Sequence, residues 1–171
     1  GEYRRVVEDL AGDGNRWTKT VRIGADGWMY VSSGSSCNVC VETDEQRAAI
    51  FRYRPDGSRY ELYATGLRNS VGMDWAPWNN ALYATDNGRD LLGDDFPPCE
   101  LNRIEKGGFY GWPQINGFAQ LDPDFGEGQE ALLGTAISPV YGFRAHNAPL
   151  GIRFLWHPER PAAYQRSALV A

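Results

Sequence analysis

The fold class is decided by residues 51–63, which read Phe-Arg-Tyr-Arg-Pro-Asp-Gly-Ser-Arg-Tyr-Glu-Leu-Tyr. Phe51 and Tyr53 share one face of an extended chain and the arginines beside them share the other, a period of two that is typical of a β-strand. Pro55-Asp56-Gly57 supplies a turn, and the chain returns through residues 60–63. The stretch therefore predicts a β-hairpin.

The same pattern recurs on both sides of this hairpin. Residues 21–31 turn at Gly24-Ala25-Asp26-Gly27, and residues 71–84 turn at Pro77-Trp78-Asn79-Asn80. Helical periodicity is nearly absent, and residues 45–50 allow at most a single turn before the next strand. Repeated hairpins are expected within the small twisted sheets of a β-propeller, so the sequence predicts an all-β fold.

Residues 86–130 differ from the rest because they are rich in Gly, Pro and Asp. The pattern predicts one strand there, from Glu100 to Ile104, so we expect long irregular loops, which are usually functional or disordered. Aromatic side chains in this stretch favour an ordered structure, since they can bury apolar area. Asp122 to Glu130 is expected to be a mobile surface loop.

The composition places the chain among globular proteins. Of its 171 residues 42% are hydrophobic, and 20 Gly with 10 Pro indicate many turns. This composition excludes disorder, collagen and coiled coil. The net charge of -5 argues against a nucleic-acid partner, whose phosphates attract basic proteins. No apolar run approaches the roughly 18 residues of a membrane span, so no span is expected.

Two polar blocks follow predicted strands and carry the candidate site. They are Gly66-Leu67-Arg68-Asn69-Ser70-Val71-Gly72 and Thr85-Asp86-Asn87-Gly88-Arg89-Asp90. Arg68 offers a planar donor fork suited to carboxylates, and Asn69 can both donate and accept hydrogen bonds. The loops at strand ends of a propeller gather around a central channel, which would bring the blocks together. The alternative is that Arg68 and Asn69 only tie one blade to the next.

The cysteines form a C-x-x-C at Cys37 and Cys40, with Cys99 apart from them. Thioredoxin-like chemistry would need a βαβ setting, and zinc would need a second pair, and neither is present. A local disulfide in an exported protein is therefore the preferred interpretation, with free thiols as the second. Cys99 would be unpaired and is expected to be a small buried residue.

Several blocks, taken in order along nearly the whole chain, carry a resemblance to a known family. They are residues 23–27, 36–40, 66–69, 85–95, 100–102, 107–113 and 146–151. The chain resembles the soluble pyrroloquinoline quinone (PQQ)-dependent sugar dehydrogenases, most closely their sorbosone and aldose dehydrogenase-like branch. The resemblance implies a six-bladed β-propeller, of which this chain would supply roughly two to three blades. We therefore expect residues 1–171 to be a single partial propeller domain, truncated at both ends.

The resemblance also implies a cofactor site built from the two polar blocks. It places Arg68 beside the reactive carbonyls of the quinone, where a guanidinium stabilises negative charge, with Asn69 next to it. Cofactor binding is implied for Asn87, Gly88 and Arg89 as well. The main-chain carbonyls of Gly88 and Arg89 correspond to ligands of a calcium ion, which prefers hard oxygen donors. The family has Gly-Pro at these positions, so Arg89 is a departure that bears on the loop geometry.

A second calcium site in the family uses an acidic side chain and a backbone carbonyl, in the stretch that matches Glu100 and Tyr110. Further carboxylates lie nearby in the sequence, at Asp86, Asp90, Asp94 and Asp95. Aspartates in loops usually form turns and caps, so ligation by Glu100 is favoured over ligation by the Asp94-Asp95 pair.

The general base is where the chain departs most from the family. The family uses a His to remove a hydroxyl proton, and by position it should lie just before Thr18. Arg16 stands there, and an arginine stays protonated. His146 is the plausible catalytic replacement, because it lies in a block that approaches the cofactor face in the family; a hydrogen-bonded loop histidine is the alternative. His157 is expected to be a surface or packing residue.

Three functions follow as hypotheses. The first is a PQQ-dependent oxidoreductase, periplasmic or secreted, that oxidises a hydroxyl of an aldose or related sugar by hydride transfer to the quinone and passes electrons to a cytochrome or quinone acceptor. The second is a non-redox propeller that binds calcium or a small molecule, which Arg16 favours. The third is a calcium-dependent, lactonase-like hydrolase, which explains Arg68 and Asn69 less well.

Overall fold

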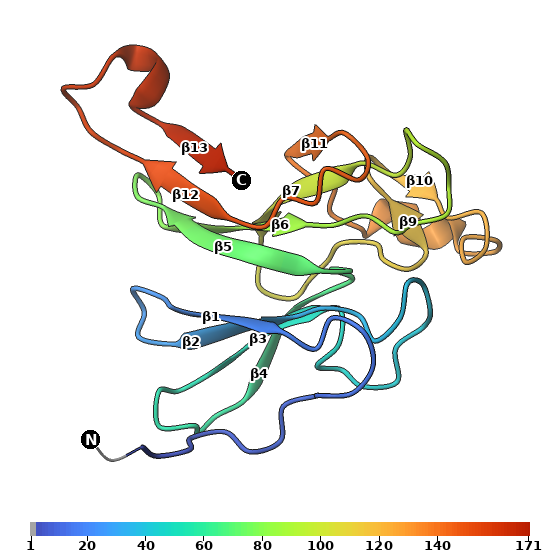
Figure 1. Ribbon diagram of the computed structural model, residues 1–171, viewed down its shortest axis with the longest axis horizontal. Helices are drawn as coiled ribbons and strands as arrows, with labels where there is room; N and C mark the ends of the chain where they lie inside the picture. Colours follow the sequence, from blue (N-terminus) through green and yellow to red (C-terminus); the bar gives the residue numbers. More distant parts are fainter. Residues whose placement is uncertain (1–2) are drawn as a thin grey trace.

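The computed structural model describes residues 3–171 (Figure 1). Its strands are β1 (Lys19–Ile23), β2 (Met29–Ser33), β3 (Ala49–Tyr53), β4 (Glu61–Thr65), β5 (Ser70–Ala76), β6 (Ala81–Asp86), β7 (Cys99–Ile104), β8 (Gly108–Phe109), β9 (Ile115–Asn116), β10 (Gln120–Leu121), β11 (Tyr141–Phe143), β12 (Ile152–Leu155) and β13 (Ser167–Val170). Within this part of the chain, helix is limited to two short 3-10 segments, η1 (Glu130–Gly134) and η2 (Ala162–Tyr164). The predicted all-β character is confirmed.

The first sheet contains two of the predicted hairpins. Its strand order is β1-β2-β3-β4-β8, and the first four strands are antiparallel. Val21 lies opposite Val31, and Phe51 lies opposite Leu62, so the alternating apolar residues share one face. The short β8 comes from much later in the chain and pairs parallel to β4.

The second sheet contains the third predicted hairpin, in the order β11-β7-β6-β5. Strands β12 and β13 form a separate antiparallel pair. Strand β5 lies between β1 of the first sheet and β12 of that pair (Figure 1). The first strands of successive small sheets, β1, β5 and β12, therefore lie next to one another. The blades of a propeller are arranged in this way.

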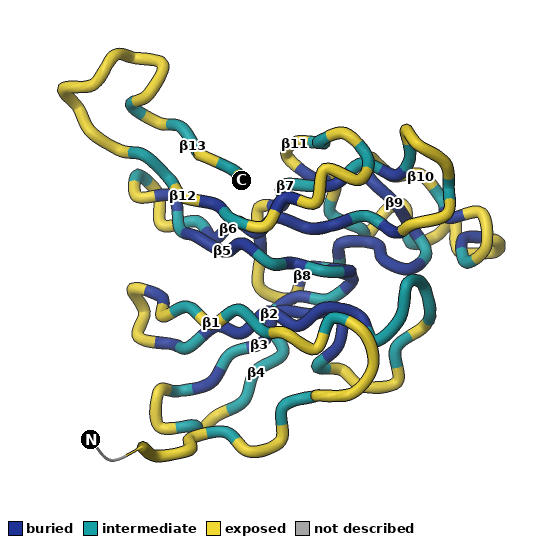
Figure 2. The backbone as a smooth tube through the Cα atoms, in the orientation of Figure 1, coloured by how far each residue is buried: buried dark blue, intermediate teal, exposed yellow. Residues whose placement is uncertain are grey.

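A shared apolar core joins the first two sheets (Figure 2). Tyr30 and Ile50 of the first sheet belong to the same buried cluster as Met73, Leu82 and Ile104 of the second. Burying each large apolar side chain stabilises the fold by roughly 1.5–3 kcal/mol. The core holds the two sheets as one rigid base for the loops at their strand ends.

The irregular regions differ partly from the sequence expectation. A turn at Glu45-Gln46 precedes β3, as expected. The stretch 86–130 contains the predicted strand at β7, together with three two-residue strands that the pattern did not indicate. The expectation of a surface loop from residue 122 is wrong at its first residue, because the Asp122 side chain is 0% exposed and ion-paired with Arg89. No helix within residues 3–171 has the length and apolar character needed to cross a membrane.

Candidate functional site

The candidate site lies where three strands reach the same edge of the second sheet. Ser70 at the start of β5 pairs with Asp86 at the end of β6, and Asp86 pairs in turn with Glu100 on β7. The segments carrying Arg68 and residues 87–90 flank these strand ends directly. The antiparallel register therefore brings the two polar blocks of the sequence together, as the propeller interpretation predicts.

Asp86 ties the two blocks to each other. Its carboxylate accepts hydrogen bonds from the backbone N–H groups of Arg68 (2.9 Å) and Asn69 (2.6 Å) and from the hydroxyl of Ser70 (3.2 Å). Asp86 is 5% exposed, and burial raises its pKa to about 6. The capping role expected of a loop aspartate is present, and it fixes the backbone on which Arg68 is carried.

The Arg68 guanidinium is buried and held by oxygen atoms on several sides. Its Nη1 donates to the main-chain oxygens of Asn87 (3.0 Å) and Gly88. Its Nε and Nη2 donate to the main-chain oxygen (2.9 Å) and the side-chain Oδ1 (2.7 Å) of Asn38. Nη2 also lies 3.4 Å from Oδ2 of Asp90. Burial lowers the Arg68 pKa to about 10, so the group stays charged at neutral pH.

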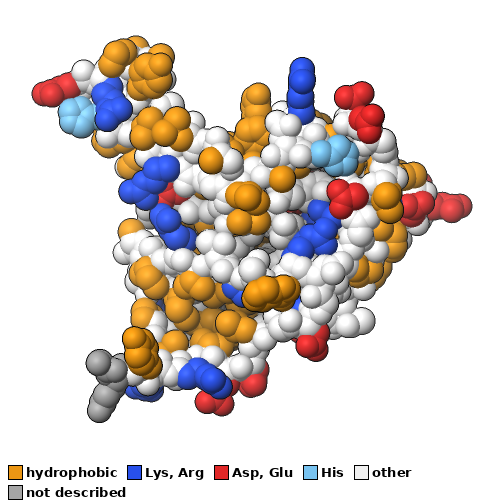
Figure 3. Space-filling model, in the orientation of Figure 1, with side chains coloured by type: hydrophobic (Ala, Val, Ile, Leu, Met, Phe, Trp, Pro, Cys, Tyr) orange, Lys and Arg blue, Asp and Glu red, His pale blue; other side chains and the backbone are white. Residues whose placement is uncertain are grey.

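A cavity of ≈ 230 Å³ opens beside this guanidinium. Its lining comprises Arg16, Arg68, Asn69, Asn87, Gly88, Asp90, Cys99, His146 and Ala148. Both predicted catalytic residues, Arg68 and His146, therefore line one cavity with three of the residues predicted to bind the cofactor. On the face shown in Figure 3, acidic, basic and histidine side chains lie close together in more than one place.

His146 lies at the mouth of this cavity with its side chain 41% exposed. Its Nε2 is 2.9 Å from the main-chain oxygen of Gly93, and its Nδ1 is 3.7 Å from Oδ1 of Asp90. A carbonyl oxygen can only accept, so the hydrogen bond to Gly93 assigns the proton of the neutral ring to Nε2. The free lone pair of the neutral ring is then on Nδ1, beside a carboxylate.

Arg16 reaches the same cavity from the segment before β1. Its Nη1 donates to the hydroxyl of Ser35 (3.2 Å) and to the main-chain oxygen of Cys37 (2.5 Å). Burial lowers the pKa of Arg16, and three surrounding carboxylates oppose this effect. The position at which the family's His is expected is thus occupied by a cation that cannot act as an ordinary base.

A second group of predicted residues surrounds the inner side of Arg68. Gly88, Arg89, Glu100 and Tyr110 line one narrow cavity together with Arg68 and Asp86. Glu100 accepts from Nδ2 of Asn102 (2.9 Å) and from the N–H of Gly117 (2.9 Å). Burial and repulsion from Asp86 raise the Glu100 pKa to about 8. Two neighbouring carboxylates are thus held away from water.

This acidic surrounding fits a bound cation. The amide oxygens of Asn87 and Asn102 are buried and have no hydrogen-bond partner among the described residues. A buried oxygen without a partner carries a desolvation cost that a cation would relieve. Of these groups, the carboxylates of Asp86 and Glu100 line the narrow cavity, and both are hard oxygen donors, the kind that calcium prefers.

The remaining predicted ligands are placed as follows. The Arg89 side chain is engaged in ion pairs with Asp122 (2.8 Å) and Asp124 (2.9 Å), so its guanidinium is already partnered by carboxylates. The Tyr110 hydroxyl donates to the main-chain oxygen of Arg103 (2.7 Å) and accepts from the N–H of Glu105 (2.7 Å). Asp94 and Asp95 are exposed.

The cysteines agree with the sequence prediction. Cys37 and Cys40 form a disulfide, and Cys99 is free and buried. Sequence reasoning missed Asn38, which lies inside the disulfide loop and contacts Arg68. Its position in the sequence could have indicated it. The segments that follow β4 and β6 carry the two polar blocks of the site, and Asn38 lies in the corresponding segment after β2.

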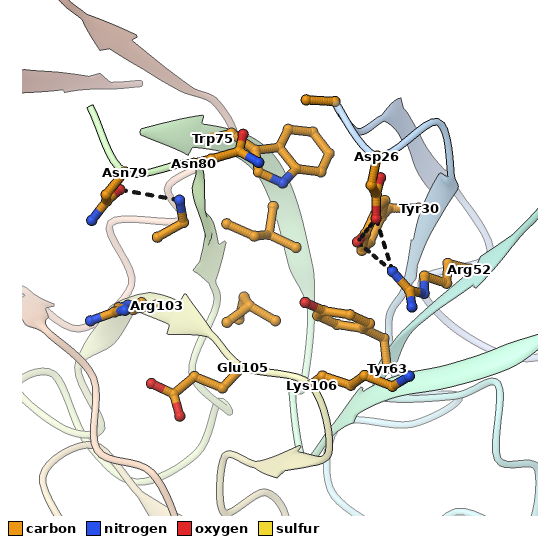
Figure 4. Close-up of a pocket in the computed structure, with 14 residues that line it drawn as sticks. Asp26, Tyr30, Arg52, Tyr63, Trp75, Asn79, Asn80, Arg103, Glu105 and Lys106 are labelled. Atoms are coloured by element: carbon orange, nitrogen blue, oxygen red, sulfur yellow. Dashed lines mark hydrogen bonds and ion pairs between the residues drawn. The ribbon is translucent and has the colours of Figure 1, made fainter. Parts of the chain in front are cut away.

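Another cavity, of ≈ 370 Å³, lies at the opposite ends of β5 and β6 (Figure 4). Asp26, Tyr30, Arg52, Tyr63 and Trp75 line one side of it. Arg52 is paired there with Asp26 (3.0 Å) and with Glu61 (2.8 Å) and stacks on aromatic rings. None of the predicted site residues lines this cavity, so it is separate from the candidate site.

The chain is similar in sequence to known proteins. A family model described as glucose/sorbosone dehydrogenase matches residues 6–171. The chain is 40% identical over 102 residues to the aldose sugar dehydrogenase YliI of Escherichia coli K12, covering 59% of this chain and 26% of that protein. It is 35% identical over 145 residues to an uncharacterized protein of Borreliella burgdorferi, covering 84% and 38%. The chain therefore spans well under half of these relatives.

Solved structures with the same arrangement include three carbohydrate-related enzymes. A Trichoderma reesei enzyme of carbohydrate-active family AA12 aligns with TM-score 0.76 and 23% identity, over 89% of this chain and 49% of its own. The apo-form of the E. coli soluble aldose sugar dehydrogenase gives 0.65 and 21%, over 88% and 46%. The PQQ-bound aldose sugar dehydrogenase of Streptomyces coelicolor gives 0.61 and 24%, over 84% and 41%. The predicted fold, part of a six-bladed β-propeller, is confirmed.

Proposed function

The chain belongs to the glucose/sorbosone dehydrogenase family, and we propose that it forms part of a PQQ- and calcium-dependent site that oxidises a hydroxyl of an aldose or related sugar. One observation carries the proposal: the fixed guanidinium of Arg68 lines a cavity together with Asn69, Asn87, Gly88 and His146. The chain spans less than half of its relatives that carry this activity by name, so the proposal concerns the full-length protein.

Arg68 supplies the electrostatic part of the proposed chemistry. Bound PQQ would supply a quinone as the acceptor of the hydride from the sugar carbon. A guanidinium already oriented by carbonyl oxygens needs no reorganisation to stabilise negative charge that develops beside it. Asn69 and Asn87 offer amide groups on the same wall of the cavity.

Calcium would be held on the inner side of Arg68. The proposed ligands are the main-chain oxygens of Gly88 and Arg89 in one site, and the Glu100 carboxylate with the main-chain oxygen of Tyr110 in the other. The raised pKa of Glu100 and its proximity to Asp86 support a cation here, because a divalent ion relieves the repulsion between the two carboxylates.

His146 is the proposed base. Its Nδ1 carries the lone pair of the neutral ring and would take the hydroxyl proton, while the Asp90 carboxylate 3.7 Å away stabilises the imidazolium. The hydrogen bond from Nε2 to Gly93 keeps the ring oriented throughout. A base that arrives from the loop after β11, rather than from the Arg16 position, would replace the histidine that the family uses.

A sugar-like substrate and an exported location complete the proposal. The Cys37–Cys40 disulfide is typical of proteins that fold outside the reducing cytosol, which supports a periplasmic or secreted site of action. The electrons would leave through a cytochrome or quinone acceptor.

The test is sugar-dependent dye reduction by the full-length protein supplied with PQQ and calcium, compared with its Arg68→Met variant. The proposal predicts turnover in the first and its loss in the second. Arg16 favours a second candidate, a propeller that binds calcium or a small molecule without redox turnover. Retained PQQ with no dye reduction on any aldose would select this second function.

A further inference from the structure

The Cys37–Cys40 disulfide closes a short loop whose second residue holds Arg68. Asn38 accepts two hydrogen bonds from this guanidinium, from Nε to its main-chain oxygen (2.9 Å) and from Nη2 to its Oδ1 (2.7 Å). Because the guanidinium is planar, two bonds to neighbouring nitrogens from one residue fix the plane as well as the position. Within residues 3–171, no other residue accepts hydrogen bonds from the Arg68 guanidinium through both its backbone and its side chain.

Asn38 is itself held in place from two directions. Its Oδ1 accepts from the N–H of Asp90 (3.1 Å), and its Nδ2 donates to the main-chain oxygen of the same residue (3.4 Å). The disulfide joins Cys37, which precedes Asn38, to Cys40, two residues after Asn38, so the loop cannot extend without breaking the crosslink. Asn38 thus connects the crosslinked loop that follows β2 to Asp90, whose carboxylate faces His146.

The same loop also contacts the other arginine of the cavity. The main-chain oxygen of Cys37 accepts from Nη1 of Arg16 and from the hydroxyl of Ser35 (2.7 Å). Both guanidinium groups that line the cavity therefore rest on carbonyl oxygens of one four-residue disulfide loop.

We propose that Asn38 is a positioning residue for Arg68, and that the Cys37–Cys40 disulfide serves to hold Asn38 against the Arg68 guanidinium. The inference rests on the proposed function for its consequence, the affinity for PQQ. Its structural content, that the Arg68 guanidinium is immobilised by Asn38 and the crosslink, stands apart from any cofactor.

The first experiment uses the full-length protein without cofactor. The side-chain Nε–H and Nη2–H resonances of Arg68, assigned through Arg68→Lys, are followed by NMR together with their hydrogen exchange, because Nη2 donates to the Oδ1 that Asn38→Ala removes. We expect slow exchange in the unaltered protein and at least about tenfold faster exchange in Asn38→Ala and in the double variant Cys37→Ser/Cys40→Ser, since a bond to a charged group is lost or loosened. Asn79→Ala, in a turn at the far end of β5, is the matched control and should leave the resonances unchanged. Equal exchange in all four proteins would overturn the proposal.

The second experiment measures PQQ affinity with calcium present. Asn38→Ala and Cys37→Ser/Cys40→Ser should each raise the Kd about tenfold, whereas Asn38→Asp, which keeps the acceptor oxygen, should restore most of the affinity. In an Arg68→Met background the Asn38→Ala change should have no further effect, because residues acting through one partner are not additive. Full additivity would contradict positioning and indicate a structural role.

The two experiments separate the inference from the function on which it rests. If the unaltered full-length protein binds no PQQ, the proposed function fails, and the NMR comparison still decides whether Asn38 immobilises Arg68. If PQQ binds with the same affinity in every Asn38 and cysteine variant, the function stands and the inference is wrong.

Discussion

Nδ1 of His146 lies 3.7 Å from Oδ1 of Asp90, while Nε2 of the same ring is hydrogen-bonded to the carbonyl of Gly93 at 2.9 Å. This arrangement orients one nitrogen for proton transfer. We expect His146→Gln to lower kcat for sugar-dependent dye reduction by about 100-fold or more, the usual contribution of a general base, with PQQ affinity nearly unchanged. His157→Gln, on an exposed segment, is the matched control. Full turnover in His146→Gln would show that the ring is only a hydrogen-bonded loop residue.

Asp90 offers a separate test of the same pair. Asp90→Asn keeps the size of the side chain and removes the charge that faces Nδ1. Turnover should fall about tenfold, because the imidazolium loses its counter-charge. Steady-state kinetics over a range of pH would detect the change. If kcat stays constant while His146→Gln is inactive, Asp90 does not assist the base.

The buried Glu100 should make the stability of the calcium-free protein depend on pH in an unusual direction. Burial and Asp86 raise its pKa from 4.5 to about 8. Below pH 4.5 the Glu100 carboxyl is protonated in both the folded and the unfolded chain, so the stabilisation of the fold that this group contributes is fully present there. Between the two values the unfolded chain releases the proton and the folded chain keeps it, so stability falls as pH rises toward 8. We expect the Tm to decline over this window, and Glu100→Gln to flatten the decline, with exposed Glu105→Gln as control.

Calcium should reverse this decline. A carboxylate must be deprotonated to bind the ion, so added calcium should raise the Tm more near pH 8 than near pH 5. The Glu100→Gln variant should lose most of this increase. An equal calcium-induced shift in both proteins, measured by calorimetry, would place the ion elsewhere.

Arg89 and Asp122 form a buried ion pair that anchors the loop after β6. Nη1 of Arg89 donates to both carboxylate oxygens of Asp122, at 2.8 and 2.9 Å, and the two side chains are 4% and 0% exposed. Arg89→Met leaves a buried charge without its partner and should lower the free energy of unfolding in urea by about 3–5 kcal/mol. Asp124→Asn, whose side chain is 58% exposed, should cost less than about 1 kcal/mol. Similar losses in both variants would contradict the assigned role of burial.

Much of the fold could be predicted because short local sequence patterns determine its hairpins. The alternation in residues 51–63 and the turns at 24–27 and 77–80 fix three hairpins, which the structure contains. Arg68 and residues 87–89 come together for the same reason, since each block adjoins a strand that ends at one edge. Strand ends are the part of a site that periodicity can locate.

The contacts that hold the site could not be predicted in this way. Asn38 lies 30 residues from Arg68, and Asp122 lies 33 residues from Arg89, with several turns between the partners. Such pairings depend on how the loops fold over the blade edges, where no repeating pattern constrains the chain. The surface-loop prediction was wrong at Asp122 because a carboxylate in a Gly- and Asp-rich stretch looks solvated until its buried partner is known.

Arg68 stands at the centre of the proposed site, and PQQ binding tests that position most directly. The full-length, calcium-loaded protein is titrated with PQQ, dialysed, and its quinone absorbance is compared with that of Arg68→Met, with exposed Arg103→Met as the control. We expect saturable, retained absorbance in the unaltered protein and in Arg103→Met, and an affinity at least about tenfold weaker in Arg68→Met. Absence of retained quinone in the unaltered protein, or equal affinity in Arg68→Met, would contradict the assignment of this site to the cofactor.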